Sequence, residues 1–242
     1  MTTKLNLGCG NNILKNYTNI DQFNNLKGVD IKCNIRELPY DDSSVDEILI
    51  SHVMEHFSFD DVQIVFKEMS RVLKIDGILE IYVPDFISCI DKWNNAEDDW
   101  SSLEWIFGSQ SHPGNFHLCG YTIESMKKIV EDFNFEIVEN KLRNNPVSND
   151  VEIKCVSRKV GDIKKNNIRF NFSMEDGPRL EIKGESNYDF RVEFWDAEND
   201  TQVHSTILRS NCWTTSKRND FSKLNIKVLQ FGKILFDLNV TE

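Results

Sequence analysis

Two glycines, an aspartate and an asparagine each follow a short apolar run near the start of the chain. Gly8 and Gly10 end the first run, where glycine lets the chain turn sharply and lets a ligand approach main-chain N–H groups. Asp21 ends the second run, and a carboxylate there can accept hydrogen bonds from both ribose hydroxyls. Asn34 ends the third; its side-chain carbonyl could accept from an adenine amino group while the Ile35 N–H donates to the ring. Ordinary turns use the same residue types, so an unspecialised turn is the alternative interpretation.

Two histidines flank a glutamate in the segment SHVMEHF. His52 and His56 would share one face if this segment were helical. Zinc proteases carry a glutamate directly after the first histidine, whereas Val53 stands there in this chain. We therefore expect no metal ion. The sequence leaves two roles open for these histidines: ordering the loop, or lying beside a substrate.

A second pair of histidines, His112 and His117, lies in the segment GSQSHPGNFHLCGYT. Glycine and proline punctuate this segment, which indicates a loop before a helix. Its polar side chains, among them Gln110 and Asn115, would suit a polyhydroxylated substrate. A surface loop without function would have a similar composition.

The elements that must position these residues alternate between short apolar strands and helical segments over residues 1–158. This alternation predicts a mostly parallel sheet covered by helices. One helix is expected between a cap at Ser58 and a stop at Gly77, and another after a cap at Thr122. An antiparallel pair at one sheet edge is expected at 135–142 and 151–159. The remaining strands are expected at 5–7, 18–20, 28–33, 44–51 and 78–84.

The connection between the first two strands is unusually short. Only residues 11–17 separate Gly10 from the second strand, whereas parallel strands normally need a crossover of a dozen or more residues. We expect the first helix to be missing or reduced to one turn. The loss of its N-terminus argues against a dinucleotide, whose pyrophosphate uses that end of a helix.

Beyond about residue 160 the pattern changes to strands and turns only, which predicts a C-terminal all-β domain at 166–242. The net charge of −11 argues against nucleic acid as a partner, because binding a phosphate backbone needs clustered Lys and Arg. Six cysteines without a C-x-x-C motif suggest reduced thiols. No apolar run approaches membrane-spanning length. We expect a soluble, cytoplasmic protein.

Four segments in order, LNLGCG, NID, NIRELPYDDSSVDEILISHVMEHF and EMSRVLKIDGILEIYVPD, resemble class I S-adenosylmethionine-dependent methyltransferases, in particular those that modify small molecules and glycans. The resemblance implies a Rossmann-like seven-stranded sheet over 1–160, parallel except for one strand, with S-adenosylmethionine across the carboxyl edge. The chain departs from the family at Asn34, where Asp is usual, and at Asp76, where the turn usually has glycine.

Carried onto this chain, the resemblance implies a set of cofactor-binding residues. The glycine loop would lie beneath the methionine moiety, Asp21 at the ribose, Asn34 and Ile35 at the adenine, and the end of the fourth strand at the mouth of the pocket. The residues so implied are Leu7, Gly8, Cys9, Gly10, Asp21, Asn34, Ile35, Ser51 and His52.

The expected reaction is methylation of a hydroxyl on a sugar, a glycan precursor or another small polar metabolite. Such a reaction needs alignment and a group that takes the proton; His117 is the first choice, with His52 and His112 behind it. The alternative is a scaffold protein that has lost catalysis and whose β domain binds a glycan or partner. Methylation of protein or nucleic acid is disfavoured by the acidic charge. The acceptor's identity and the oligomeric state stay open.

Overall fold

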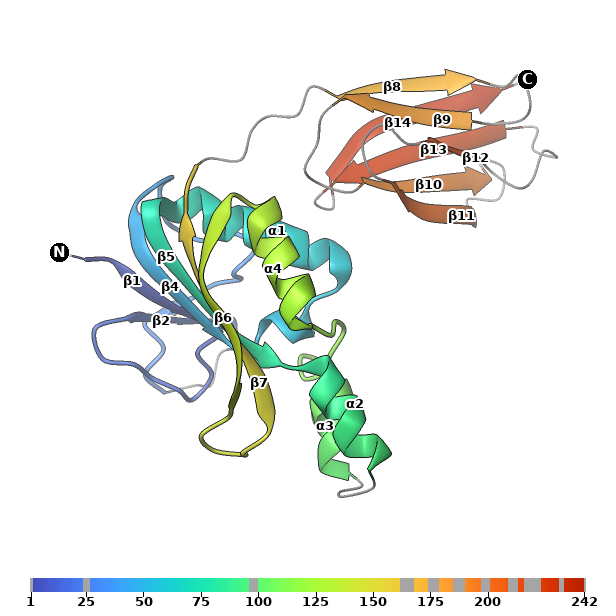
Figure 1. Ribbon diagram of the computed structural model, residues 1–242. Coiled ribbons are helices and arrows are strands. Elements are labelled where there is room, and N and C mark those ends of the chain that lie inside the picture. Colours follow the sequence, from blue (N-terminus) through green and yellow to red (C-terminus); the bar gives the residue numbers. More distant parts are fainter. Residues whose placement is uncertain are drawn as a thin grey trace. The chain divides into compact units, whose positions relative to one another are not determined.

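The computed structural model describes residues 2–23, 27–95, 100–161, 168–173, 179–184, 190–196, 201–208, 213–215, 223–230 and 233–241. The chain forms two compact units, Met1–Ile163 and Lys164–Glu242. Figure 1 shows a sheet with helices in the first unit and strands in the second. Part of the boundary expected from the sequence, residues 162–167, lies outside the described residues.

The first unit contains the predicted seven-stranded sheet, in the order β3-β2-β1-β4-β5-β7-β6 (Figure 1). Strand β7 runs antiparallel to both of its neighbours, while the other pairings are parallel. The expectation of one reversed strand beside an edge strand is therefore confirmed. The strands are β1 (Lys4–Leu7), β2 (Thr18–Asp21), β3 (Ile31–Lys32), β4 (Val45–Ser51), β5 (Leu73–Pro84), β6 (Phe135–Asn144) and β7 (Val151–Lys159).

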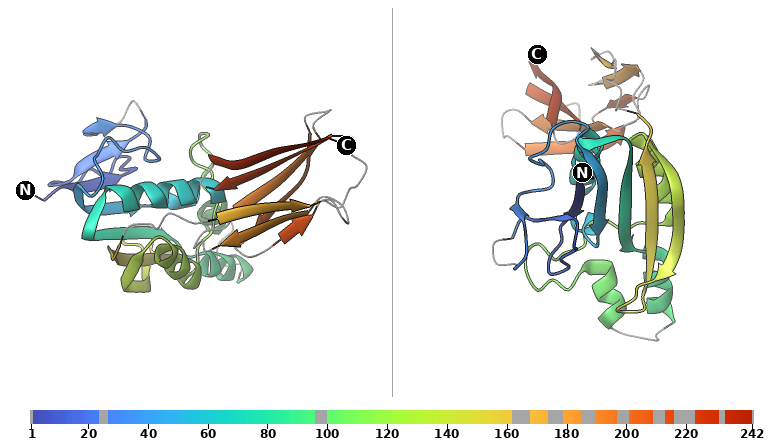
Figure 2. Two further views of the ribbon diagram at one scale, coloured as in Figure 1. Left: turned by 90° about the horizontal axis from the view of Figure 1, so that it is seen from above. Right: turned by 90° about the vertical axis from the view of Figure 1, so that its left-hand side faces the viewer.

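Helices begin at the predicted caps. Ser58 accepts a hydrogen bond from the Asp61 N–H at the start of α1, and Thr122 accepts one from Ser125 at the start of α4. Figures 1 and 2 show α1 and α4 on the same side of the sheet. The described helices are η1 (Met54–His56), α1 (Phe59–Val72), α2 (Phe86–Asn94), α3 (Trp100–Phe107) and α4 (Ile123–Asp132), and none of them is long and apolar enough to cross a membrane.

The core of the first unit lies between the sheet and these two helices. Phe66 of α1 stacks on Phe133, which follows α4, with ring centroids 5.4 Å apart. The apolar residues that recur at helical spacing along α1 are buried, and most apolar side chains of the central strands β4 and β5 are buried as well.

Three local expectations differ from the structure. The segment from His52 to His56 is not a continuous helix, because His52 has a φ of +54° and only Met54–His56 form a 3-10 helix. The two histidines therefore do not share a helical face. The helix α1 ends at Val72 rather than near Gly77, and Asp76, with a φ of +64°, makes an irregularity within β5. The third strand is only Ile31–Lys32.

The predicted loss of the first helix is confirmed: residues 8–17 connect β1 to β2 through turns alone. Two buried amides hold this loop. Asn6 Nδ2 donates to Asn19 Oδ1 (2.9 Å) and to the Asn12 carbonyl (2.8 Å). Asn19 Oδ1 also accepts from the Leu14 N–H at 2.9 Å. Hydrogen bonds from the Asn6 and Asn19 side chains therefore hold a connection that in other parallel sheets is formed by a crossover helix.

The second unit consists, in its described residues, of antiparallel strands in two sheets, with the orders β11-β10-β13-β14 and β12-β9-β8. Leu180, Val192, Phe194 and Ile226 are fully buried between their neighbours. The Trp195 indole instead donates to Glu193 at 3.0 Å. The strands are β8 (Ile168–Ser173), β9 (Arg179–Gly184), β10 (Phe190–Asp196), β11 (Thr201–Leu208), β12 (Trp213–Thr215), β13 (Lys223–Gln230) and β14 (Lys233–Thr241).

Replacing Asn19 by Ala should loosen the loop, because the buried Asn6 amide loses one of its two acceptors and the Leu14 N–H loses its acceptor. We expect a loss of about 2 kcal/mol or more of unfolding free energy and faster hydrogen exchange at the Leu14 amide. Asn12→Ala is the control, since that side chain is exposed. Hydrogen exchange measured by mass spectrometry checks both; equal effects of the two substitutions would contradict this account of the loop.

Candidate functional site

The carboxyl ends of β1, β2 and β4 surround an open cavity of about 740 Å³, which is within the usual range for ligand pockets. This is the sheet edge where open α/β folds bind ligands. Its walls come from three stretches of chain: the β1–β2 region, the segments after β3 and β4, and the loop before α4. The lining residues are Gly8, Gly10, Asn11, Asp21, Gln22, Phe23, Cys33, Asn34, Ile35, Arg36, His52, Val53, His56, Phe57, His112, Pro113, Gly114 and Asn115.

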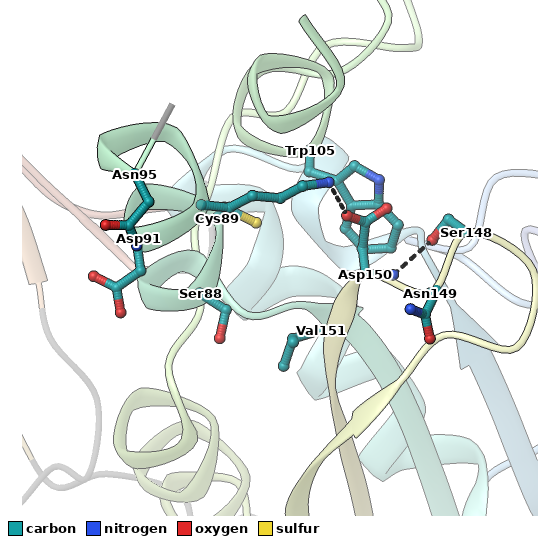
Figure 3. Close-up of a pocket in the computed structure, with 10 residues that line it drawn as sticks. Ser88, Cys89, Asp91, Asn95, Trp105, Ser148, Asn149, Asp150 and Val151 are labelled. Atoms are coloured by element: carbon teal, nitrogen blue, oxygen red, sulfur yellow. Dashed lines mark hydrogen bonds and ion pairs between the residues drawn. The ribbon is translucent and has the colours of Figure 1, made fainter. Parts of the chain in front are cut away.

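A second cavity, of about 400 Å³, lies between α2, Trp105 of α3 and the loop before β7 (Figure 3). Lys92 and Asp150 form an ion pair across it at 2.8 Å, and the Asp150 N–H donates to Ser148. None of the glycines or acidic residues singled out in the sequence lines this cavity. The larger cavity is therefore the candidate site.

Both glycines of the first loop have the left-handed backbone that glycine adopts without strain: φ is +63° at Gly8 and +51° at Gly10. A Cβ on Gly8 would lie 2.5 Å from Val53 Cγ2, so only glycine allows β1 and the segment after β4 to approach this closely. A Cβ on Gly10 would meet nothing within 4 Å. Gly10 therefore borders open space, while Gly8 lies against Val53 in the cavity lining.

Asp21 links the ends of β1 and β2. Its side chain is buried, and its Oδ2 accepts from the Gly10 N–H while its Oδ1 accepts from the Phe23 N–H, both at 2.9 Å. Each carboxylate oxygen has a second acceptor site. Because Asp21 also lines the cavity, it can receive hydroxyl donors from a ligand there.

Cys9, between the two glycines, is buried. Burial and the nearby Asp21 charge raise the pKa of its thiol to about 11. The thiol is therefore protonated at neutral pH and a poor nucleophile.

Asn34 forms a turn with the residue two positions on. Its Oδ1, the oxygen expected to accept from an adenine amino group, accepts from the Arg36 N–H at 3.0 Å and from Arg36 Nη1 at 3.5 Å. Ile35 is buried and lines the cavity. In the described part of the chain its backbone N–H has no hydrogen-bond acceptor, so this donor is available to a ligand.

His52 belongs to a charged network at the end of β4. Its Nε2 lies 2.8 Å from Glu152 Oε2 and its Nδ1 lies 3.4 Å from Glu55 Oε1. Arg143 pairs with the other Glu152 oxygen, and Glu152 is fully buried. Burial alone would lower the His52 pKa, but the two glutamates outweigh it and raise this pKa to about 9. His52 is therefore an imidazolium at neutral pH.

The histidines of the loop before α4 differ in environment. His112 is exposed and lines the cavity, edge-on to Phe23, and its Nδ1 accepts from the Gly114 N–H at 3.2 Å. His117 is half-buried behind His56, with ring centroids 4.8 Å apart. Its Nδ1 lies 2.9 Å from the Trp105 carbonyl. Burial lowers the pKa of His117, which keeps this imidazole neutral.

Nine of the residues singled out in the sequence line the one cavity: Gly8, Gly10, Asp21, Asn34, Ile35, His52, His56, His112 and Asn115. Leu7 and Cys9 are buried behind it, and Ser51 and His117 lie outside its lining. Sequence reasoning did not single out Phe23, Arg36 or Phe57. For Phe23 a signal existed, since it follows the carboxylate by two residues; the other two come to the cavity only through the tertiary fold.

Comparisons with known proteins agree on the fold. Residues 5–81 match the family described as methyltransferase domain. A comparison with curated proteins found no match. A SAM-dependent methyltransferase from Methanosarcina mazei is similar in structure, with a TM-score of 0.50 and 16% identity over 65% of this chain and 92% of that one.

A 1,6-didemethyltoxoflavin-N1-methyltransferase from Burkholderia thailandensis, solved with bound 1,6-didemethyltoxoflavin and S-adenosylhomocysteine, has a TM-score of 0.47 and 14% identity, over 66% of this chain and 71% of that one. Together, the family match and the Methanosarcina structure give the first unit the fold of class I methyltransferases.

Proposed function

We propose that this chain is an S-adenosylmethionine-dependent methyltransferase that methylates a hydroxyl of a small polar acceptor, such as a sugar or glycan precursor. The observation that carries the proposal is the single cavity at the strand ends. Gly10 and Asp21 line this cavity, and so do His52, His56 and His112. Cofactor and acceptor could thus meet in one space.

The residues present fit the cofactor. Asp21 keeps free acceptor positions for ribose hydroxyls, and the Ile35 N–H is a donor for the adenine ring. The open space at Gly10 leaves room for the amino-acid part. S-adenosylmethionine has no pyrophosphate, so the missing first helix removes nothing that its binding requires.

Bound S-adenosylmethionine supplies a methyl group on a positively charged sulfur. In the proposed transfer the acceptor oxygen forms a bond to the methyl carbon, the carbon–sulfur bond breaks with its electron pair going to sulfur, and the hydroxyl proton leaves to a base. The chain's part is to align the oxygen with the methyl group and to receive the proton.

The three candidate bases, His52, His112 and His117, differ in their ability to accept that proton. His52 is already protonated, with Nε2 facing Glu152 and Nδ1 facing Glu55. His112 accepts at Nδ1 from a backbone N–H, so its Nε2 is the protonated nitrogen, a donor. His117 is neutral, and its Nδ1 donates to a carbonyl, which leaves the lone pair on Nε2. We assign removal of the proton to His117. This residue does not line the cavity itself but contacts His56, which does.

The acceptor class follows from the cavity rim. Asn115, His112 and Gln22 offer hydrogen-bond donors and acceptors there, while the net charge of −11 would repel a polyanion. We place the protein in the cytoplasm, because the five described cysteines are unpaired thiols. We assign the strands of the second unit to an accessory domain.

Asp21→Asn should weaken S-adenosylmethionine binding at least about tenfold, because hydrogen bonds to a charged carboxylate contribute about 1.5–3 kcal/mol. Asp30→Asn is the matched control: Asp30 also accepts a backbone N–H, from Asn19 at 2.8 Å, but does not line the cavity. Isothermal titration calorimetry of each folded full-length variant measures the dissociation constant. Failure of the folded wild type to bind, or equal affinities for Asp21→Asn and wild type, would reject the cofactor site.

Incubation with S-adenosylmethionine and a panel of sugars, sugar nucleotides and polyols should release S-adenosylhomocysteine and give a product heavier by one methylene group. Mass spectrometry of acceptor and cofactor products measures both. RNA and acidic or basic peptides serve as comparison substrates. Methyl transfer confined to RNA or peptide would show the acceptor class to be wrong while leaving the cofactor site standing.

A further inference from the structure

Three side chains that could bind a metal ion meet beside the cavity. They are Glu55 and His56 of η1 and His117 of the loop before α4, and their ligand atoms all lie within 4.8 Å of one another. Only His56 also lines the cavity. The cluster therefore forms part of the cavity's wall, with one member in contact with its space.

Backbone hydrogen bonds fix the two segments that carry this cluster. The Glu55 carbonyl accepts from the Leu118 N–H at 2.7 Å and from the Cys119 N–H at 3.1 Å. The Tyr121 hydroxyl donates to the Met54 carbonyl at 3.2 Å. Because these contacts flank Glu55 and His117 on both segments, the three side chains are held together without a ligand's help.

Both imidazoles are oriented as metal ligands are. His56 Nδ1 lies 3.1 Å from the Phe116 carbonyl, and His117 Nδ1 lies 2.9 Å from the Trp105 carbonyl. A carbonyl only accepts, so in this arrangement each Nδ1 carries the hydrogen and each Nε2 keeps its lone pair. Histidines bound to metals commonly donate their other N–H to a carbonyl in this way.

The buried carboxylate of Glu55 lacks the hydrogen-bond donors that normally surround a buried charge. The residue is 2% exposed, and neither carboxylate oxygen has a hydrogen-bond partner among the described residues. His52 Nδ1, at 3.4 Å, is within ion-pair range but outside hydrogen-bond geometry, and His52 is shared with Glu152. Burying a carboxylate without hydrogen bonds is unfavourable. A cation between Glu55 and the two Nε2 atoms would remove this penalty.

We propose that Glu55, His56 and His117 bind a divalent transition-metal ion, with zinc as the reference case. Two imidazoles and one carboxylate suit zinc and its neighbours better than magnesium or calcium, which prefer oxygen ligands. Zinc lies about 2.1 Å from such atoms, so the side chains would draw in by about an ångström. Three protein ligands leave a position open toward the cavity beside His56.

This proposal replaces the expectation of no metal, which considered His52 and His56 as the pair. His52 faces Glu152 and the Trp105 ring instead, and the second imidazole comes from His117, far along the chain. The assignment of this metal site is argued only from the positions of the three side chains. Its role rests on the proposed function: with the metal ion on Nε2, His117 would no longer take the proton itself, and an acceptor hydroxyl bound at the open position would instead lose its proton more readily, to solvent.

The test measures metal binding in the absence of S-adenosylmethionine. Full-length protein is stripped with a chelator, checked by circular dichroism, and titrated with Co²⁺, followed by its visible absorption, and with Zn²⁺, followed by calorimetry. We expect one ion per chain. Glu55→Gln and His117→Asn should each lower the affinity at least about tenfold. His112→Ala, a histidine of the same cavity outside the cluster, should leave the affinity unchanged.

A measurement on the wild type guards against variants that fail to fold. In long-range ¹H–¹⁵N spectra, Zn²⁺ should shift the Nε2 resonances of two histidines and leave the others in place. The proposal is overturned if the folded, stripped wild type binds no ion, if binding persists unchanged in Glu55→Gln and His117→Asn, or if it is lost in His112→Ala. None of these results bears on cofactor binding, which the Asp21 variants test separately.

Discussion

The hydrogen bonds of two buried amides, Asn6 and Asn19, are the constraint on which the rest of the site depends. They hold the ten-residue stretch 8–17 that connects parallel strands without a helix. With this loop fixed, the Gly10 N–H meets the Asp21 carboxylate and joins the ends of β1 and β2. The floor of the cavity and its acidic side are therefore set by contacts between neighbouring strands rather than by a crossover helix.

The part of the cavity lined by His52 and His56 depends on a different set of contacts. The segment after β4 is fastened to the loop before α4 through the Glu55 carbonyl, and to β7 through the His52–Glu152 pair. Glu152 is in turn paired with Arg143 of β6. The reversed strand β7 thus does more than close the sheet: it supplies the buried charge that holds His52 protonated at the cavity's edge.

The difference between these two sets of contacts explains why part of the site could be predicted from the sequence and part could not. Gly8, Gly10 and Asp21 each follow a strand, and the ends of parallel strands meet at one edge, so their convergence on one cavity follows from local patterns. The short spacing between β1 and β2 predicted in the same way that the first helix would be missing. The capping residues Ser58 and Thr122 act within one turn of chain and were equally accessible.

What failed depends on backbone details or on distant partners. The positive φ of His52 breaks the helical spacing assumed for SHVMEHF and turns His52 and His56 toward different neighbours. Asp76, with its positive φ, lies inside β5, which begins at Leu73, where the helix was expected to run on to a stop at Gly77. His117 meets Glu55 only because backbone hydrogen bonds join two segments far apart in sequence, which no periodicity encodes.

The central claim is that one cavity at the ends of β1, β2 and β4 holds the cofactor beside its acceptor. A crystal structure of the full chain with S-adenosylhomocysteine tests it most directly. We expect the ribose hydroxyls within hydrogen-bond distance of the Asp21 carboxylate, the adenine ring at the Ile35 N–H, and the sulfur on the side of His52 and His56. A nucleoside bound elsewhere, for instance in the cavity at α2 shown in Figure 3, would contradict the account.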